Sequence, residues 1–158
     1  MTDDVVGCLA CDLTSGRRPV PGGVLLEVGG WRVEHCVGPL GVGTLIVKPV
    51  RHVRHVAELS DGESAALGPL LRRVAAAVTE VVRPEQVYVC LWSHDGGTPG
   101  HLHFVVQPVT RADLDRFGVF GPRLQLAMFD AKVTPDETAV AEVSGRVRPV
   151  LQRADQPG

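Results

Sequence analysis

The sequence predicts an α+β fold, in which an antiparallel sheet of five strands packs against one long helix and a C-terminal helix. Three observations lead to this prediction: five short runs of apolar and β-branched residues, short glycine-rich links between neighbouring runs, and one long stretch with the spacing of an amphipathic helix. Links this short join antiparallel strands, whereas parallel strands need a long crossover. The expected order is therefore strands, long helix, strands and helix.

Glycine and proline mark the ends of the predicted strands. Gly29-Gly30 separates the first two runs, which favours a β-hairpin. Pro49 closes the third strand, since proline cannot donate a ladder hydrogen bond. The last two strands are joined by the turn SHDGGTPG. The predicted strands are residues 24–28, 31–37, 44–49, 86–92 and 101–107.

Two stretches carry helical signals. The first, residues 60–82, opens with Ser60 and Glu63 in the spacing of a capping box and continues with apolar residues on one face. The second spans about residues 135–151, with a proline at its first turn. The first 23 residues are rich in turn formers and predict a loop.

Composition places the chain among ordinary globular proteins. Its 158 residues suffice for one domain, and its apolar fraction of 44% and charged fraction of 22% are typical of a folded protein. The net charge of -2 argues against a nucleic-acid binder, which is usually basic. No apolar run approaches the ~20 residues of a membrane helix, and the N-terminus shows no secretory signal. A cytoplasmic protein without a membrane segment is expected.

Cysteine spacing indicates one metal or redox site. Cys8 and Cys11 form a C-x-x-C pair, which suits a metal ion or a redox couple. A disulfide framework is disfavoured in a chain without an export signal. The other two cysteines, Cys36 and Cys90, lie in apolar, strand-like surroundings and are interpreted as small buried residues.

Histidines supply the other candidate ligands. His101 and His103 lie two apart on a predicted strand and so share one face, with Cα atoms about 6.5–7 Å apart, which lets them serve adjacent sites. Zinc accepts thiolate and imidazole ligands, so the C-x-x-C pair and two histidines make a plausible tetrahedral set. His35 and His55 are interpreted as ordinary polar residues of the fold. The histidines of the chain are His35, His52, His55, His94, His101 and His103.

Three segments together resemble a known family: CLACDLTSG, GTLIVKPVRHVRHVAELSDGE and GTPGHLHFVVQP. In order and spacing they are similar to the histidine-triad (HIT) superfamily of nucleotide hydrolases and nucleotidyl transferases. The resemblance runs from residue 8 to about residue 108, roughly two-thirds of the chain. It implies a single HIT-like domain over residues 1–158, with a core of about 5–110 and a helical extension of about 111–158.

The last segment resembles the family's triad, H-φ-H-φ-H, in two of its three positions. His101 matches the first histidine and His103 the second, while Val105 stands at the third. In the family the second histidine attacks phosphorus and forms a nucleotidyl-histidine intermediate, so the resemblance makes His103 the catalytic nucleophile. A neutral imidazole is a competent nucleophile at about pH 7. The transferase branch carries glutamine at the third position, so the missing histidine does not by itself remove catalysis.

Zinc-containing members of the family imply a structural zinc site in this chain. Their ligands are a C-x-x-C pair, a histidine after the third strand and the first triad histidine. By position these are Cys8, Cys11, His52 and His101. His55 competes with His52, but the P-x-R-H pattern matches His52 better. Such a zinc ion has no open coordination position and would brace the loop against the last strand.

The glycine-rich turn DGGTPG is expected to bind a phosphoryl group through backbone N–H groups. Thr98 matches a family hydroxyl close to the phosphate, and Gly97, Gly100 and Ser93 complete the predicted substrate contacts. Two of these depart from the family, since Gly97 replaces a glutamine and Ser93 an asparagine. Cys36 stands where the family commonly carries an aspartate that binds the ribose hydroxyls. The usual ribose and phosphate contacts are thus reduced.

Three functional interpretations follow from this resemblance. The first is a hydrolase or nucleotidyl transferase that acts at phosphorus through a covalent His103 intermediate, on a nucleoside phosphoramidate or dinucleoside polyphosphate. The second is a similar enzyme adapted to a modified or non-nucleotide phosphorylated substrate, and the third is a non-catalytic domain that binds a phosphorylated ligand.

Retention of His103 together with Thr98 and the glycine turn favours the two enzymatic interpretations. A zinc-stabilised fold with an incidental His103 is the remaining alternative. The expected ligand is a small nucleotide or another phosphorylated metabolite, not a nucleic acid. The resemblance also implies a homodimer.

Overall fold

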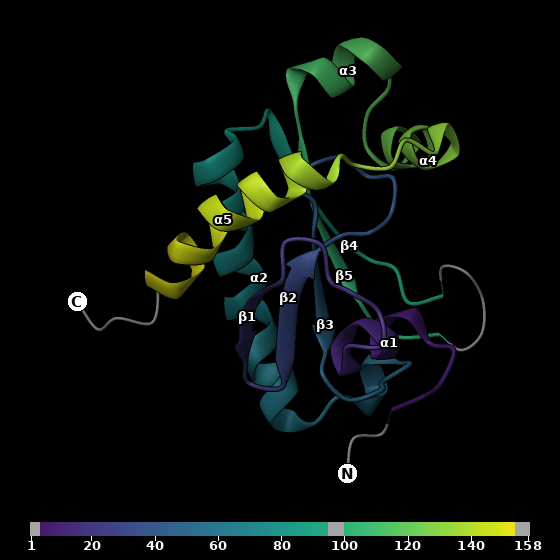
Figure 1. The fold of residues 1–158 in the computed structure, drawn as a ribbon, viewed down its shortest axis with the longest axis vertical. Helices are drawn as coiled ribbons and strands as arrows, with labels where there is room; N and C mark the ends of the chain where they lie inside the picture. Colours follow the sequence, from purple (N-terminus) through teal and green to yellow (C-terminus); the bar gives the residue numbers. More distant parts are fainter. Residues whose placement is uncertain (1–3, 95–99, 154–158) are drawn as a thin grey trace.

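A five-stranded antiparallel sheet forms the centre of the molecule (Figure 1). The computed structural model describes residues 4–94 and 100–153. The strands are β1 (Val24–Val28), β2 (Trp31–His35), β3 (Leu45–Pro49), β4 (Gln86–Leu91) and β5 (Phe104–Val109). Their order across the sheet is β1-β2-β3-β5-β4, and every neighbouring pair is antiparallel. The predicted fold class is therefore confirmed.

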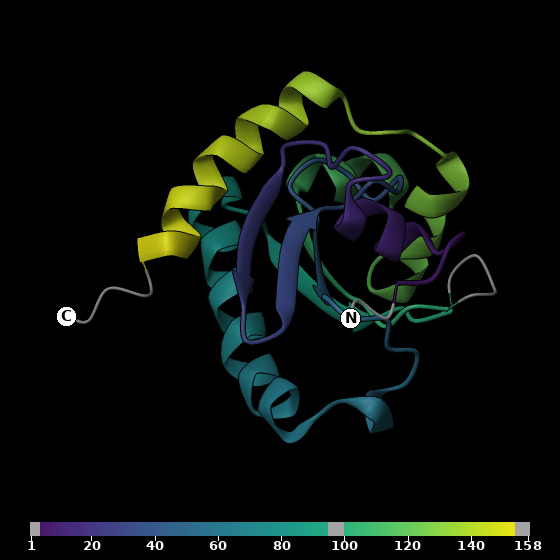
Figure 2. The ribbon, with the colours of Figure 1, turned by 60° about the horizontal axis from the view of Figure 1, so that its bottom comes forward.

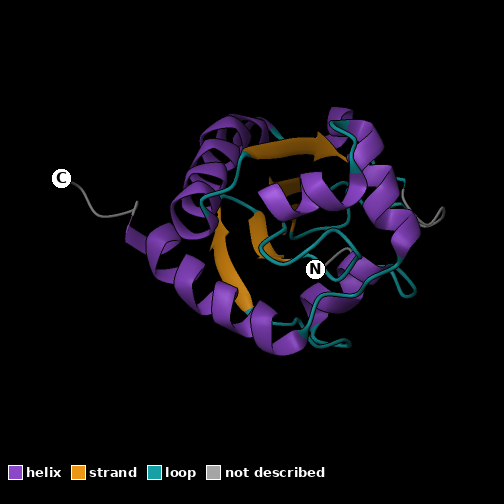
Figure 3. Ribbon diagram, turned by 90° about the horizontal axis from the view of Figure 1, so that it is seen from above, coloured by secondary structure: helices purple, strands orange, loops and turns teal. Residues whose placement is uncertain are grey.

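Helices cover both faces of this sheet (Figures 2 and 3). They are α1 (Leu9–Ser15), α2 (Asp61–Val82), α3 (Arg111–Phe117), α4 (Pro122–Ala131) and α5 (Glu137–Arg153), with a 3-10 turn, η1, at Val56–Glu58. The long helix α2 and the C-terminal helix α5 pack against each other on one side, whereas α1 and α4 lie on the opposite side (Figure 2). In the described ranges, no helix is long and apolar enough to cross a membrane.

Side chains of the sheet divide between two cores because successive strand residues point to opposite faces. Val33, Val47 and Val106 belong to a buried apolar cluster under α2 and α5. Their strand neighbours Ile46 and Val105 belong to a second cluster, to which α4 contributes Leu124 and Met128. The second face of the sheet is the one that carries the candidate site described below.

The hairpin predicted at Gly29-Gly30 is present between β1 and β2. Both glycines have positive φ angles, 57° and 80°, which a type I′ turn requires and which other residues rarely adopt. The turn sets the register, with Val28 opposite Trp31. Trp31 is fully buried, and its Nε1–H donates to the Glu63 carbonyl of α2 over 3.0 Å.

Two segments near the candidate site differ from the sequence prediction. The region expected as a loop contains the seven-residue helix α1, which is too short for its periodicity to stand out among turn formers. Strand β5 begins at Phe104, three residues later than predicted. The reason is that Leu102 N–H donates to the Val53 carbonyl, 2.7 Å away, before the chain joins the sheet. The two histidines of interest therefore precede the strand.

Helices α3 and α4 lie in the expected helical extension of about 111–158, but the sequence prediction places only one helix there, near residues 135–151. Thr110 and Asp113 form a capping box at α3, and Pro122 occupies the first turn of α4. These signals are present in the sequence, but the helices span only 7 and 10 residues. The expected helix corresponds to α5. Residues after 110 thus supply helices to both faces of the sheet.

The capping box predicted at the start of α2 is present, and an ion pair ties it to the segment after β3. Ser60 Oγ accepts from Glu63 N–H, and the Glu63 carboxylate accepts from Ser60 N–H. The same carboxylate accepts two bonds from the Arg51 guanidinium, at 2.8 and 2.9 Å. Arg51 is the main reason that the pKa of Glu63 falls from 4.5 to about 2.

The lowered pKa of Glu63 makes stability depend on acid pH. A carboxyl group whose pKa falls on folding stabilises the protein above its unfolded pKa and loses that contribution as the pH drops through the folded value. We expect Glu63→Gln to lower the free energy of unfolding by about 1–3 kcal/mol at neutral pH. The difference from wild type should shrink between about pH 5 and pH 2.

Urea unfolding of both proteins across this pH range measures the effect. Asp61→Asn, an exposed change in the same helical turn, is the matched control and should cost less. A Glu63→Gln effect that is independent of pH, or no larger than that of the control, would contradict the assignment.

Candidate metal centre and active site

Four side chains converge from three separate parts of the chain. They are Cys8, Cys11, His52 and His101, and their ligand atoms all lie within 4.8 Å of one another. The two cysteines come from the start of α1, His52 follows β3, and His101 precedes β5. The structure therefore brings together the four residues that the sequence predicted as metal ligands.

The spacing of these ligand atoms fits a tetrahedral metal ion. Cys8 Sγ lies 3.5 Å from His101 Nδ1, and Cys11 Sγ lies 3.3 Å from His52 Nδ1 and 3.6 Å from His101 Nδ1. Sulfur and nitrogen ligands of tetrahedral zinc stand about 3.5 Å apart, given Zn–S and Zn–N bonds of about 2.3 and 2.0–2.1 Å. Two thiols and two imidazoles are also the donor set that zinc prefers.

A backbone contact orients His101 for this role. Its Nε2 lies 3.2 Å from the Pro49 carbonyl oxygen, which can only accept a hydrogen bond. Nε2 therefore carries the proton, and Nδ1 presents its lone pair to the two sulfur atoms. The His52 ring packs edge-on against the His101 ring, with centroids 5.1 Å apart.

Burial shifts the pKa values of two groups in the cluster towards their neutral forms. It lowers the pKa of His101 to about 4, so the imidazole is neutral and able to act as a ligand. It raises the pKa of the Cys11 thiol to about 11. A bound dication reverses this second effect, because it stabilises the thiolate directly. The four side chains could thus hold a metal ion, whereas two free thiolates would be disfavoured at this buried place.

Short-range geometry of α1 explains why the two cysteines face the same way. Cys8 is the N-terminal cap of the helix and Cys11 lies in its first turn, and residues three apart in a helix share a face. Lys48 Nζ donates to the Ala10 carbonyl over 2.9 Å, which ties the helix to β3. Gly16, with a φ of 81°, ends the helix.

Two other histidines, His35 and His55, lie outside the cluster. His35 is buried, its Nδ1 lies 2.8 Å from the Cys36 carbonyl, and its Nε2 accepts from Gly43 N–H at 2.9 Å. Burial lowers the pKa of His35, which keeps it neutral in this role. His55 is exposed and caps η1. Both are interpreted from the sequence as ordinary polar residues, and it is His52, not His55, that lies in the four-residue cluster.

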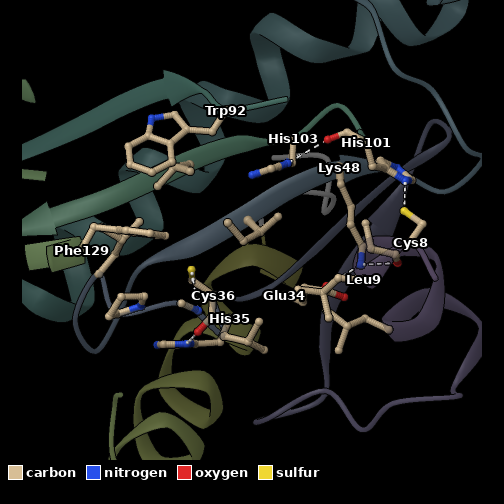
Figure 4. A pocket seen from close by; sticks show the side chains of 18 residues that line it. Cys8, Leu9, Glu34, His35, Cys36, Lys48, Trp92, His101, His103 and Phe129 are labelled. Carbon is tan, nitrogen blue, oxygen red and sulfur yellow. Dashed lines mark hydrogen bonds and ion pairs between the residues drawn. The ribbon is translucent and has the colours of Figure 1, made fainter. Parts of the chain in front are cut away.

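A cavity of about 210 Å³ lies next to the ligand cluster and is lined by both His101 and His103. His103 Nδ1 lies 2.9 Å from the His101 carbonyl oxygen. Because this oxygen only accepts, Nδ1 carries the proton and Nε2 holds the lone pair. Figure 4 shows the His101 ring directed towards Cys8 and the His103 ring directed the other way, over the cavity. The prediction that the two side chains share one face of a strand is therefore wrong, because both residues precede β5 and their rings point in different directions.

The position after His103 on this face of the sheet is apolar. Val105 lines the cavity, is 1% exposed, and packs in the second core beside Leu124 and Met128. It offers no hydrogen bond to a ligand. Cys36, at the position of the expected ribose-binding aspartate, also lines the cavity, and its Sγ accepts from Gly38 N–H at 3.3 Å.

The predicted substrate-binding residues are placed only in part. Gly97 and Thr98 lie outside the described residues. Ser93 is half-buried after β4 and Gly100 is buried before His101. Neither is among the described residues that line the cavity. All four roles stay predictions.

Four further side chains line the cavity, of which the sequence had pointed only to Glu34, as an alternative ribose contact to Cys36. Trp92 and Phe129 form an aromatic wall, with ring centroids 5.8 Å apart. Phe129 belongs to α4, a helix absent from the prediction. Glu34 and Lys48 form a buried ion pair across β2 and β3, with side chains only 2% and 1% exposed. The one signal for this pair was a lysine at the end of the apolar run TLIVKP.

Comparisons with known proteins give likeness in structure and none in sequence. The chain matches no family model and no curated protein. It superposes on a hypothetical histidine triad nucleotide-binding protein from Sulfolobus tokodaii with a TM-score of 0.69 at 16% identity, covering 92% of this chain and 93% of that one. On a zinc-bound histidine triad family protein from Mycobacterium smegmatis it superposes with a TM-score of 0.67 at 19% identity, covering 94% of this chain and 96% of that one. On a Hit-like protein from Bartonella henselae it superposes with a TM-score of 0.66 at 13% identity, covering 89% of this chain and 93% of that one.

We expect one zinc ion per chain in protein purified without added metal, and near zero in Cys8→Ser. Cys90→Ser is the matched control, because Cys90 lies outside the cluster and bonds to Gln125 instead. With zinc at about 1,000 times its Kd, removal of the metal costs about 4 kcal/mol. A chelator should then lower Tm by roughly 8–16 °C in a chain of this length. Zinc-free protein with an unchanged Tm, or equal zinc content in the two variants, would contradict a structural metal centre.

Proposed function

We propose that this chain, which has the histidine-triad fold, belongs to the histidine-triad superfamily and is an enzyme that hydrolyses or transfers a nucleoside monophosphoryl group through His103. One observation carries the proposal. His103 lines a cavity beside the predicted metal centre, and its contact with the His101 carbonyl leaves the lone pair on Nε2. An imidazole in this state can attack phosphorus without prior deprotonation.

The proposed reaction has two displacement steps at phosphorus. In the first, His103 Nε2 forms a bond to phosphorus while the bond from phosphorus to the leaving group breaks. In the second, water or another acceptor attacks phosphorus, and the phosphorus–nitrogen bond breaks to release His103. Splitting one displacement into two in this way is the general advantage of nucleophilic catalysis. Hydrolysis and transfer then differ only in the acceptor.

The four-ligand metal centre acts through the position of His103 rather than through substrate. A site with four protein ligands has no open coordination position, which is the pattern of a structural metal. When bound, the metal would fix His101, and the His101 carbonyl in turn accepts from His103 Nδ1–H. This contact sets both the tautomer and the direction of the nucleophile.

The phosphoryl group is proposed to lie at the glycine-rich turn before His101. Its backbone N–H groups and the Thr98 hydroxyl would donate to the phosphoryl oxygens, with Gly97, Gly100 and Ser93 shaping the approach. The apolar walls at Trp92 and Phe129 would exclude water around the reacting centre. Exclusion of water strengthens such hydrogen bonds.

A second candidate function is favoured by the observation that Cys36 lines the cavity. A cysteine is a poor hydrogen-bond acceptor for ribose hydroxyls. The site would then serve a modified nucleotide or a non-nucleotide phosphorylated metabolite, with the same role for His103. A domain that binds a phosphorylated ligand without catalysis is the remaining candidate.

The proposed assembly is a homodimer. Strand β4 is an edge of the sheet, and two of its apolar side chains, Val89 and Leu91, are 45% and 41% exposed. An edge strand with exposed apolar side chains suits pairing with a second chain. The expectation of a dimer itself comes from the family resemblance.

His103→Ala tests the catalytic proposal. We expect turnover of nucleoside 5′-phosphoramidates or dinucleoside polyphosphates to fall at least about 1,000-fold, since the nucleophile is lost. Zinc content and Tm should stay at wild-type values, because His103 is outside the ligand cluster. His94→Ala, which removes an exposed histidine near the end of β4, is the control and should keep full activity. Equal activity of the two variants would refute the proposal.

Cys36→Asp tests the reduced ribose contact. A carboxylate at this place can accept from two ribose hydroxyls, and charge-assisted bonds contribute about 1.5–3 kcal/mol each. Wild type should bind AMP weakly and discriminate little against 2′,3′-dideoxy-AMP. The variant should bind AMP at least about tenfold more tightly and recover the discrimination. Strong discrimination already in wild type would show that another residue binds the ribose.

A further inference from the structure

An ion pair that is sealed from bulk water lies in the wall of the cavity. Glu34 on β2 and Lys48 on β3 are both buried, with side chains 2% and 1% exposed. Lys48 Nζ donates to Glu34 Oε1 and to the Ala10 carbonyl. A pair of this kind is expensive to bury, and apolar side chains of similar size often stabilise a fold as well or better. Stability alone therefore gives no reason for this pair.

The pair is only half satisfied by the protein. Glu34 Oε2 is buried, and among residues 4–94 and 100–153 it has no hydrogen-bond partner. A buried carboxylate oxygen left without a donor is costly, and such an atom in a native site calls for a ligand or an ordered water. Of the three Lys48 N–H donors, two have acceptors among the described residues. An acceptor and a donor thus stand side by side at the cavity.

The position of the pair within the cavity indicates which part of a ligand it meets. Figure 4 shows Glu34 and Lys48 at one end, beside Leu9, and the rings of Trp92 and Phe129 at the other. His103 lies between the two ends. If phosphorus sits at His103, the Glu34 end receives a group some distance from the reacting centre, which is where a nucleotide carries its base.

We infer that Glu34 and Lys48 recognise the hydrogen-bonding edge of a nucleobase, and that guanine is the base that fits them. This inference rests on the proposed function. Guanine carries adjacent N–H donors, which suit the Glu34 carboxylate, beside a carbonyl acceptor, which suits Lys48. Adenine offers one donor group only, next to a ring nitrogen that accepts. Leu9 and Leu13 provide the apolar surface on which a planar ring packs.

Two nucleotides that differ only at this edge test the inference. GMP and purine riboside 5′-monophosphate share ribose, phosphate and the bicyclic ring, but the second lacks the N–H donors and the carbonyl. We expect the zinc-containing full chain to bind GMP at least about tenfold more tightly, since a site built for hydrogen bonds rejects a ligand that cannot make them. Isothermal titration calorimetry gives both dissociation constants.

The double variant E34M/K48M removes the pair without leaving one charge buried alone. It should fold, bind both nucleotides, and show a ratio of dissociation constants close to one. E27Q is the matched control, because Glu27 pairs with Arg32 on the neighbouring strands and its side chain is 49% exposed. The control should keep the wild-type ratio.

A wild-type ratio near one overturns the inference even if the double variant fails to fold. A preference for GMP that survives in the folded double variant overturns it as well. In both cases turnover that depends on His103 would leave the proposed function standing. Failure of the wild type to bind either nucleotide would count against both.

Discussion

The Cys8, Cys11, His52 and His101 cluster is the constraint on which the site depends. It joins the first helix, the segment after β3 and the segment before β5, which are distant in the sequence. His101 makes two further hydrogen bonds. Its Nε2–H donates to the Pro49 carbonyl, and its own carbonyl accepts from His103 Nδ1–H. A metal ion at this cluster would therefore fix the position of His103, the proposed nucleophile, through His101.

The sheet separates the parts of the molecule that hold the fold from those that would do chemistry. One face, under α2 and α5, is filled with apolar side chains such as Val33 and Val106. The opposite face carries His103 and the Glu34–Lys48 pair in a cavity that Phe129 of α4 helps to close. Polar groups on this face cost stability, as buried ions do. Buried polar groups beside a histidine that lines a cavity are typical of a binding site.

Sequence reasoning found the four residues of the cluster because their spacing and residue types are local signals. Strong periodicity likewise located α2, and the Gly29-Gly30 pair located the hairpin. It missed α1, α3 and α4, which are too short for periodicity, and it began β5 too early because Leu102 bonds to Val53 outside the sheet. Glu34 and Lys48 are 14 residues apart, and only the register of β2 on β3 brings them together.

The central claim is that His103 becomes covalently bonded to phosphorus. Wild-type protein mixed with a panel of nucleoside 5′-phosphoramidates, then denatured at alkaline pH where a phosphorus–nitrogen bond survives, can be weighed intact by mass spectrometry. The account predicts one added nucleoside monophosphoryl group per chain, mapped by peptide sequencing to His103. Turnover of a panel member with the added mass on another residue would contradict it.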